Sequence, residues 1–186
     1  MLGVLILFVK ICEKLKYIAK GNKFKLSGKV RFIECDGKKY PNFADVKTAI
    51  AAGEAAVSEW HKNLNPLVGR TAIMRRLRNA ATKTSEAIIT YGAVGTGAGV
   101  PANSDTTLFT EIKRVTVASF DQTDNELTIN IFFTTTEGNG TLTNFGLFGE
   151  DATAVADSGT LFEKIVISKV KDASKTLTLE CVLTLN

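Results

Sequence analysis

From about residue 86 onward, the chain consists of short strand-like segments at even spacing, separated by tight turns. In residues 126–136 apolar and polar residues alternate, which is the period of a β-strand with one buried face. The apolar members of this alternation are Leu127, Ile129, Ile131 and Phe133. No proline follows Pro101, so no proline-rich linker interrupts this half of the chain. The pattern predicts an antiparallel β-sandwich or barrel-like domain.

The first part of the chain differs in composition and predicts a mostly helical, basic module at residues 1–63. Residues 1–20 fit an amphipathic helix, and a strand fits their β-branched start equally well. Residues 24–40 alternate apolar and basic positions before an Asp36–Gly37 pair, which predicts a short β-hairpin. The alanine-rich residues 43–63 predict a second helix. Together with the β-rich domain, this module gives an α+β fold.

An arginine-rich helix is predicted to open the second unit, residues 64–186. Asn65 suits the N-cap of this helix and Pro66 its first helical position. Its arginines form a candidate interaction surface: Arg70, Arg75, Arg76 and Arg78. They contact either nucleic-acid phosphates or an acidic surface of this chain or a neighbouring subunit. The charge distribution favours the acidic surface, because residues 1–79 hold 16 basic and 6 acidic residues, whereas residues 80–186 hold 7 and 13.

The apolar run Leu2–Val9 is too short to cross a bilayer as a helix. It also lacks the positive leading segment and small-residue cleavage site of a secretory signal. Three interpretations remain for it: burial in this chain, an arm that docks on a neighbouring subunit, or an upstream extension from a misassigned start. We expect no membrane span.

Four glycines lie within eight residues at Gly92–Gly99, which raises the question of a phosphate-binding loop. A Walker loop needs a Gly-Lys pair followed by Ser or Thr, but no lysine lies between Lys83 and Lys113. A dinucleotide fingerprint needs a different glycine spacing and a helix directly afterwards, where Pro101 stands. The segment instead predicts a strand, a glycine turn and a short helix that begins near Thr106.

Six residues shape this predicted joint: Gly95, Gly97, Pro101, Asp105, Glu111 and Arg114. The glycines permit a positive φ or a close backbone approach, and the proline stiffens the exit from the turn. Ser104 or Asp105 caps the predicted helix. Glu111 and Arg114 are three residues apart, so on a helix their side chains pair.

Reactive side chains are sparse in the sequence. The cysteines, Cys12, Cys35 and Cys181, form no CxxC pair, and His61 is the single histidine. This composition predicts neither a metal site nor a disulfide framework, and three free thiols fit a reducing cytoplasm. We therefore predict no catalytic residue and no cofactor, and we expect that the protein is not an enzyme.

Three segments resemble a pattern in small structural proteins of tailed bacteriophages. "GRTAIMRRL" at residues 69–77 precedes "AIITYGAVGTGAGVPANSDTTLFTEIKR" at residues 87–114, and "NFGLFGE" follows at residues 144–150. The matching positions are Tyr91, Ala93, Val94, Gly95, Thr96, Gly97, Pro101, Asp105, Thr106, Leu108, Glu111, Arg114, Gly146, Leu147 and Phe148. The resemblance covers about residues 64–186, and residues 1–63 show none.

The resemblance implies a non-enzymatic virion component of the tail, collar or fibre-attachment region. Such a protein is made in the host cytoplasm and incorporated into the virion as a homo-oligomer. Its expected partners are further copies of itself and other virion proteins. The alternative, from the basic first half alone, is a protein associated with nucleic acid.

Overall fold

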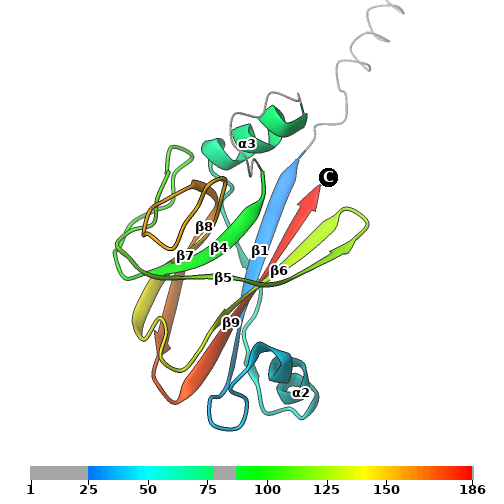
Figure 1. Cartoon of the computed structure of the whole chain (residues 1–186), viewed down its shortest axis with the longest axis vertical. Coiled ribbons are helices and arrows are strands. Elements are labelled where there is room, and N and C mark those ends of the chain that lie inside the picture. The colour runs from blue at the N-terminus through cyan, green and yellow to red at the C-terminus, as the bar shows by residue number, and fades with distance from the viewer. Residues whose placement is uncertain (1–24, 78–86, 186) are drawn as a thin grey trace, which may run out of the picture.

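The structure is a computed structural model that describes residues 25–77 and 87–185 of the 186-residue chain. One antiparallel sheet dominates these residues (Figure 1). Its nine strands are β1 (Leu26–Asp36), β2 (Ala56–Val57), β3 (His61–Lys62), β4 (Ile89–Gly95), β5 (Glu111–Thr123), β6 (Glu126–Phe133), β7 (Gly140–Gly149), β8 (Thr160–Lys171) and β9 (Lys175–Leu185). The helical elements among the described residues are the 3-10 turn η1 (Phe43–Asp45), α2 (Val46–Ala51) and α3 (Leu67–Leu77).

Neighbouring strands follow the order β2-β1-β9-β6-β5-β4-β7-β8, and β3 also pairs with β1. The sheet curls into a half-barrel, and the chain between β1 and α3 bridges its two long edges. β2 and β3 pair with β1, and Leu64 then forms an antiparallel bridge with Lys164 on β8. Lys169 on β8 also donates a hydrogen bond to Glu34 on β1. β1 and β8, which lie near the two ends of this strand order, are therefore tied together around the core.

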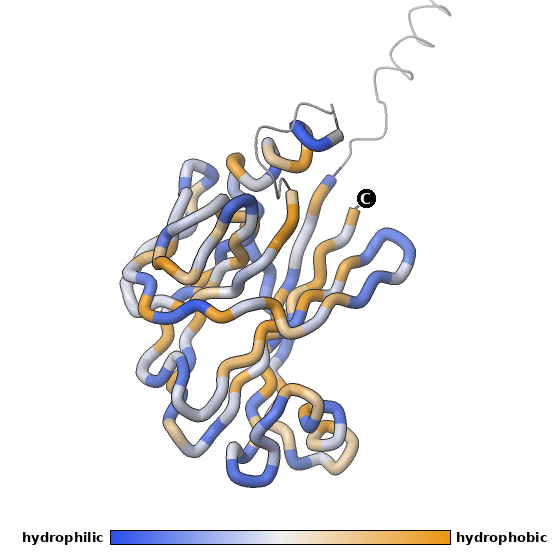
Figure 2. Tube along the Cα trace, viewed as in Figure 1, coloured by the Kyte–Doolittle hydropathy of each residue, from blue (hydrophilic) through white to orange (hydrophobic). Residues whose placement is uncertain are grey.

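Alternate residues of the long strands fill the interior. On β6, Ile129, Ile131 and Phe133 are fully buried, which confirms the alternation predicted for this segment. They belong to one cluster with apolar residues of β1, β7, β8 and β9. Burial of each such side chain contributes about 1.5–3 kcal/mol to stability. Figure 2 shows hydrophobic residues along these strands and hydrophilic residues at the tip of the β5–β6 hairpin.

The predicted α+β fold with a mostly helical N-terminal module is wrong for the described residues, which are mostly antiparallel β. In place of the hairpin predicted at residues 24–40, β1 continues to Asp36 and pairs over all 11 residues with β9. Asp36 and Gly37 do turn the chain, but Gly37 donates its N–H to Ser174 in the β8–β9 turn. The distant strand β9 thus takes the place of a local partner. The helix or strand predicted at residues 1–20 lies outside the described residues.

The helix predicted over residues 43–63 is also wrong beyond its first turns. It ends at Ala51, shortly before Gly53, whose φ of 71° is typical of a residue that follows a helix. The chain then becomes extended, because β2 and β3 form backbone pairs with the edge of β1. Pairing with an existing sheet here overrides the helical propensity of alanine.

The arginine-rich helix is confirmed as α3, although it begins at Leu67, one residue after Pro66, its predicted first position. It packs on β8 through Gly69, where an added Cβ would lie 2.7 Å from Phe162 Cα. The absence of a side chain at Gly69 therefore permits the close approach of helix and strand. In the described parts of the chain, no helix is long and apolar enough to span a membrane.

Candidate functional site

The glycines of the sequence motif lie where β4 ends against the chain that enters β5. An added Cβ on Gly95 would lie 2.6 Å from Phe109 O, and one on Gly97 would lie 2.7 Å from Phe109 C. Neither glycine has a positive φ. Of the two reasons predicted for these glycines, close backbone approach is the one that applies.

Asn144 on β7 holds this crossing together. Its side chain is fully buried, and its Nδ2 donates to Gly97 O at 3.0 Å and to Phe109 O at 2.9 Å. Its Oδ1 accepts from Phe109 N at 3.1 Å, and the neighbouring Thr143 hydroxyl donates to Gly97 O at 2.6 Å. Phe109 O also accepts from Gly97 N at 2.9 Å, so the amide reinforces this backbone contact and supplies the acceptor for Phe109 N. Asn144 was not among the predicted site residues. Its one signal in the sequence is that it is a polar residue within the largely apolar segment "TLTNFGLFG".

Glu111 and Arg114 form the predicted pair, but on β5 rather than on a helix. The pair is bidentate, with Arg114 Nε 2.6 Å from Glu111 Oε1 and Nη2 2.7 Å from Oε2. Residues three apart on a regular strand point to opposite faces. Here the β4–β5 register shifts between Val94 and Gly95, so that Ile112 is an extra residue on β5. This bulge brings both side chains to one face.

The Glu111–Arg114 pair fastens the loop between β7 and β8 to the sheet. Arg114 Nη1 donates to Thr153 O at 3.0 Å, to Ser158 O at 3.1 Å and to Ser158 Oγ at 3.0 Å. Asp157 N donates to Glu111 Oε2 at 3.2 Å. The side chains of the pair are only 2% and 1% exposed. A buried pair with these additional partners fixes the loop, whereas an exposed pair would contribute little.

Asp105 is the acceptor in a third contact of the motif. It accepts a hydrogen bond from Ala102 N and lies 2.9 Å from the ammonium group of Lys164 on β8. Burial alone would raise the pKa of Asp105, but the contacts with Lys164 and Ala102 outweigh it and hold this pKa below its usual value. The helix predicted near Thr106 is wrong, because the chain between β4 and β5 contains no helix. Pro101 is half-buried in this connection.

The arginines of the candidate interaction surface have different partners. Arg75 Nη2 lies 3.0 Å from both carboxylate oxygens of Glu150, whose side chain is fully buried. Arg70 donates to Asn103 Oδ1 at 3.2 Å and is exposed, as is Arg76. Arg78 lies outside the described residues. At Arg75 the helix thus meets an acidic residue of the β-rich half, which is one of the two predicted interpretations.

A buried carboxyl group on β8 was not predicted. Glu163 is 1% exposed, and neither of its carboxyl oxygens makes a hydrogen bond among the described residues. Asn63 lies beside it, since a Cβ added to Gly28 would contact both side chains at 2.3 Å. Burial raises the pKa of Glu163 from 4.5 to about 8, although the amides of Asn63 and Asn65 act in the opposite direction. Glu163 is therefore largely protonated at neutral pH.

Asn63 also lines a basic hollow. Its volume is about 470 Å³, and the cations that line it are Lys25, Lys29, Lys62 and Arg70. Trp60 lies next to it on the β1 edge, with Lys29 Nζ 4.6 Å and Arg31 Cζ 4.7 Å from the ring centroid. An exposed indole with two cations close to its ring is a surface on which anionic or aromatic groups can bind.

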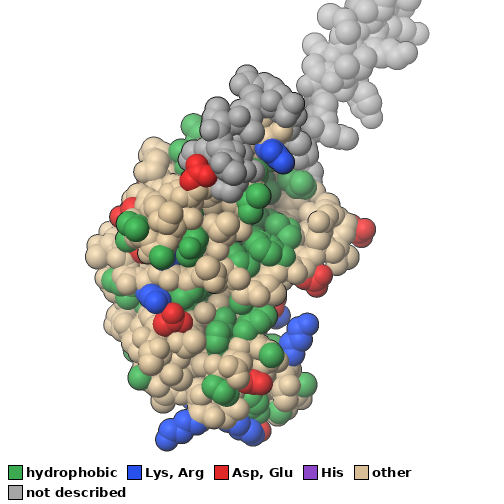
Figure 3. Space-filling model, in the orientation of Figure 1, with side chains coloured by type: hydrophobic (Ala, Val, Ile, Leu, Met, Phe, Trp, Pro, Cys, Tyr) green, Lys and Arg blue, Asp and Glu red, His purple; other side chains and the backbone are tan. Residues whose placement is uncertain are grey.

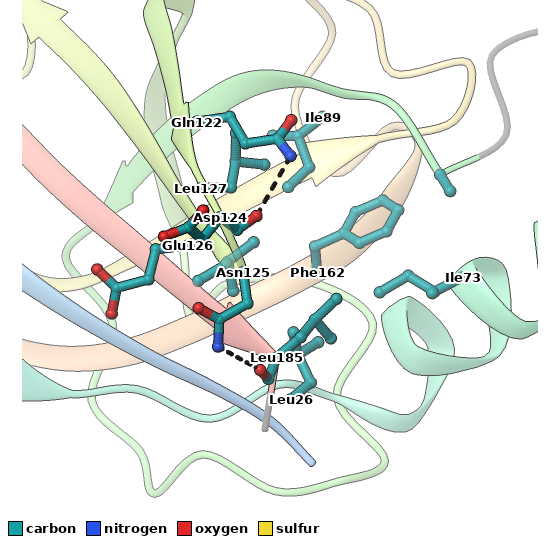
Figure 4. A pocket seen from close by; sticks show the side chains of 12 residues that line it. Leu26, Ile73, Ile89, Gln122, Asp124, Asn125, Glu126, Leu127, Phe162 and Leu185 are labelled. Atoms are coloured by element: carbon teal, nitrogen blue, oxygen red, sulfur yellow. Dashed lines mark hydrogen bonds between the residues drawn. The ribbon is translucent and has the colours of Figure 1, made fainter. Parts of the chain in front are cut away.

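An apolar groove of about 270 Å³ lies between α3 and the tip of the β5–β6 hairpin. Figure 3 shows hydrophobic side chains gathered in the hollow on this face. Ile73 points from α3 towards Phe162 of β8, and the start of β1 and the end of β9 complete the wall (Figure 4). The apolar lining residues are Leu26, Ile73, Ala87, Ile89, Leu127, Phe162, Leu183 and Leu185.

Within residues 25–77 and 87–185, no three His, Cys, Asp or Glu side chains are placed to hold a metal ion. Burial raises the pKa of the Cys35 thiol, and raises that of Cys181 well above its usual value. Both thiols are therefore poor nucleophiles. Comparisons with protein-family models, with curated proteins and with solved structures gave no match.

Proposed function

We propose that the protein is a non-enzymatic structural component of a tailed-phage virion, located in the tail, collar or fibre-attachment region. It is made in the host cytoplasm, associates with further copies of itself, and docks on neighbouring virion proteins. The proposal extends the resemblance of residues 64–186 to such proteins.

The observation that carries the proposal is the use of the motif residues within the fold. The glycines permit a backbone crossing, Asp105 pairs with Lys164, and Arg114 with Glu111 fastens the β7–β8 loop. A motif that served catalysis would present polar groups to a cavity, where a reacting molecule reaches them. These polar groups are instead occupied by other parts of the same chain. That arrangement supports a motif whose role is to set the shape of each copy.

The outer edge of β8 supports association between copies. Beyond Leu64, which bridges to Lys164, the rest of this edge has no strand partner among the described residues. Val166 and Val170 on it are 48% and 70% exposed. An edge strand with apolar side chains suits burial against another protein.

Light scattering on the purified full chain tests self-association. We expect a discrete species heavier than the 20.1 kDa monomer at every concentration measured. The variant Val170→Lys should shift this species towards the monomer, whereas Val155→Lys, which alters an exposed loop valine, should not. A monomer at all concentrations that captures no other virion protein would count against the proposal.

The basic hollow favours a second candidate function, association with nucleic acid. Lys25, Lys29, Lys62 and Arg70 line one hollow beside an exposed Trp60, which suits a phosphate backbone. This function predicts DNA binding that weakens steeply as salt rises. The double variant Lys29→Ala with Lys62→Ala should then abolish binding, and Lys47→Ala on α2 should leave it intact. Equal binding by both variants would remove this candidate.

A further inference from the structure

The apolar groove between α3 and the β5–β6 hairpin lies where the described chain begins and ends. Leu26 at the start of β1 and Leu185 at the end of β9 both form part of its wall. A neighbouring hollow of about 200 Å³ shares Leu26, Ile73 and Leu185 and extends the apolar surface to Met74. An apolar surface of this extent is stabilised when another apolar group covers it.

Acidic side chains stand at one rim of the groove. Asp124 and Glu126 line it from the β5–β6 hairpin tip. This tip has a fixed position, because Asn125 Nδ2 donates to Leu185 O at 2.7 Å (Figure 4). In addition, the Thr184 hydroxyl donates to Glu126 at 3.2 Å. The groove therefore presents an apolar floor and a negatively charged rim. A suitable occupant has an apolar segment next to positive charge.

The N-terminal part of this chain has that chemistry. Leu2–Val9 contains apolar residues and glycine only, and residues 10–25 contain six lysines and one glutamate. The chain from residue 10 to residue 25 leads directly to Leu26 in the groove wall. Residues 78–86 are a second possible occupant, because they directly precede Ala87 of the groove wall. Ala80 and Ala81 are, however, their only apolar members. Of the two, only the N-terminal segment matches both floor and rim.

We propose that Leu2–Val9 binds in the groove of its own chain, with the lysines of residues 10–25 beside the acidic rim. A connection of 16 residues has a root-mean-square reach of roughly 22 Å if it is flexible. Tethering over this distance gives the segment an effective concentration in the millimolar range. The segment of the same chain therefore outcompetes that of a second copy at ordinary protein concentrations. This inference concerns the isolated subunit and does not depend on the virion assignment.

Hydrogen exchange on the full-length protein tests the proposal. The variant Leu5→Asp with Leu7→Asp places two charges in the apolar segment. It should raise amide exchange severalfold in residues 122–127 and 183–185, which border the groove. The matched control, Val100→Asp with Val155→Asp, carries the same two charges at exposed valines outside the groove and should leave that exchange unchanged. Added peptide with the sequence of residues 2–9 should restore protection in the first variant.

Two results would overturn the inference. Equal exchange at the groove in the wild type and the Leu5/Leu7 variant would show that this segment does not cover it and would leave residues 78–86 as the alternative occupant. Protection that depends on protein concentration, together with a loss of mass in the variant by light scattering, would assign the segment to a second copy. Circular dichroism checks that each variant is folded, and the peptide addition keeps the test valid if the first variant is destabilised.

Discussion

Replacing Glu163 with glutamine should remove a large pH dependence of stability. In the folded protein the pKa of this carboxyl is raised from 4.5 to about 8 by burial. Below pH 4.5 both the folded and the unfolded state hold the proton, so the stabilising contribution is fully present. As pH rises towards 8 the unfolded state releases the proton while the folded state retains it, and this contribution is lost.

The magnitude follows from the size of the pKa shift. A shift of one pKa unit corresponds to about 1.4 kcal/mol. The rise from 4.5 to about 8 therefore costs the wild type about 5 kcal/mol of unfolding free energy between the acid and the alkaline end of this range. Such a loss is comparable with the entire stability of many domains. Glutamine has nearly the same shape and no titrating proton, so Glu163→Gln should escape the loss.

Urea unfolding at a series of pH values measures the effect, because the midpoint and slope give the unfolding free energy at each pH. We expect the Glu163→Gln curve to separate from the wild-type curve as pH rises from 4.5 to 8, with the variant more stable above pH 8. Glu59→Gln is the matched control, since Glu59 is an exposed glutamate. Parallel curves for the wild type and Glu163→Gln over this range would refute the account of a buried neutral carboxyl.

Three further substitutions test the contacts of the motif. Gly97→Ala should destabilise the fold by about 1–3 kcal/mol, because its Cβ would meet the backbone of Phe109, and thermal unfolding measures this. Arg114→Met leaves Glu111 buried without its partner, so we expect a loss of about 3–5 kcal/mol and faster proteolysis of the β7–β8 loop; unchanged proteolysis would contradict the fastening role. Asn144→Ala should cost about 1–3 kcal/mol in the same thermal measurement, because it leaves Phe109 N without its acceptor.

Local patterns in the sequence predicted the buried strand β6 and the start of α3. Alternation on β6 reports the two faces of a strand, and a proline before α3 marks a helix start, so each signal lies within its own element. Extended structure was predicted at residues 24–40, but as a hairpin rather than as the single strand β1, because its partner, β9, lies some 150 residues further along the chain. No local cue contains that pairing, and the Asp36–Gly37 turn pointed to a hairpin instead.

Only part of the candidate site could be predicted, again because a local pattern does not show how distant strands come together. The spacing of Glu111 and Arg114 led to the correct pair and to the wrong element, because the strand bulge that aligns them has no signature in one sequence. Close backbone approach was one of the two reasons predicted for Gly95 and Gly97, and it is the one that the structure shows. Asn144 and Glu163 were missed, since a single polar residue in a strand does not reveal whether it faces solvent or the core.

The most direct test of the virion assignment is a mass-spectrometric analysis of purified phage particles released by a host that expresses this gene. We expect the chain in the particles at a fixed copy number, similar to that of other tail or collar proteins. Its absence from particles while it is abundant in the same lysate would contradict the account.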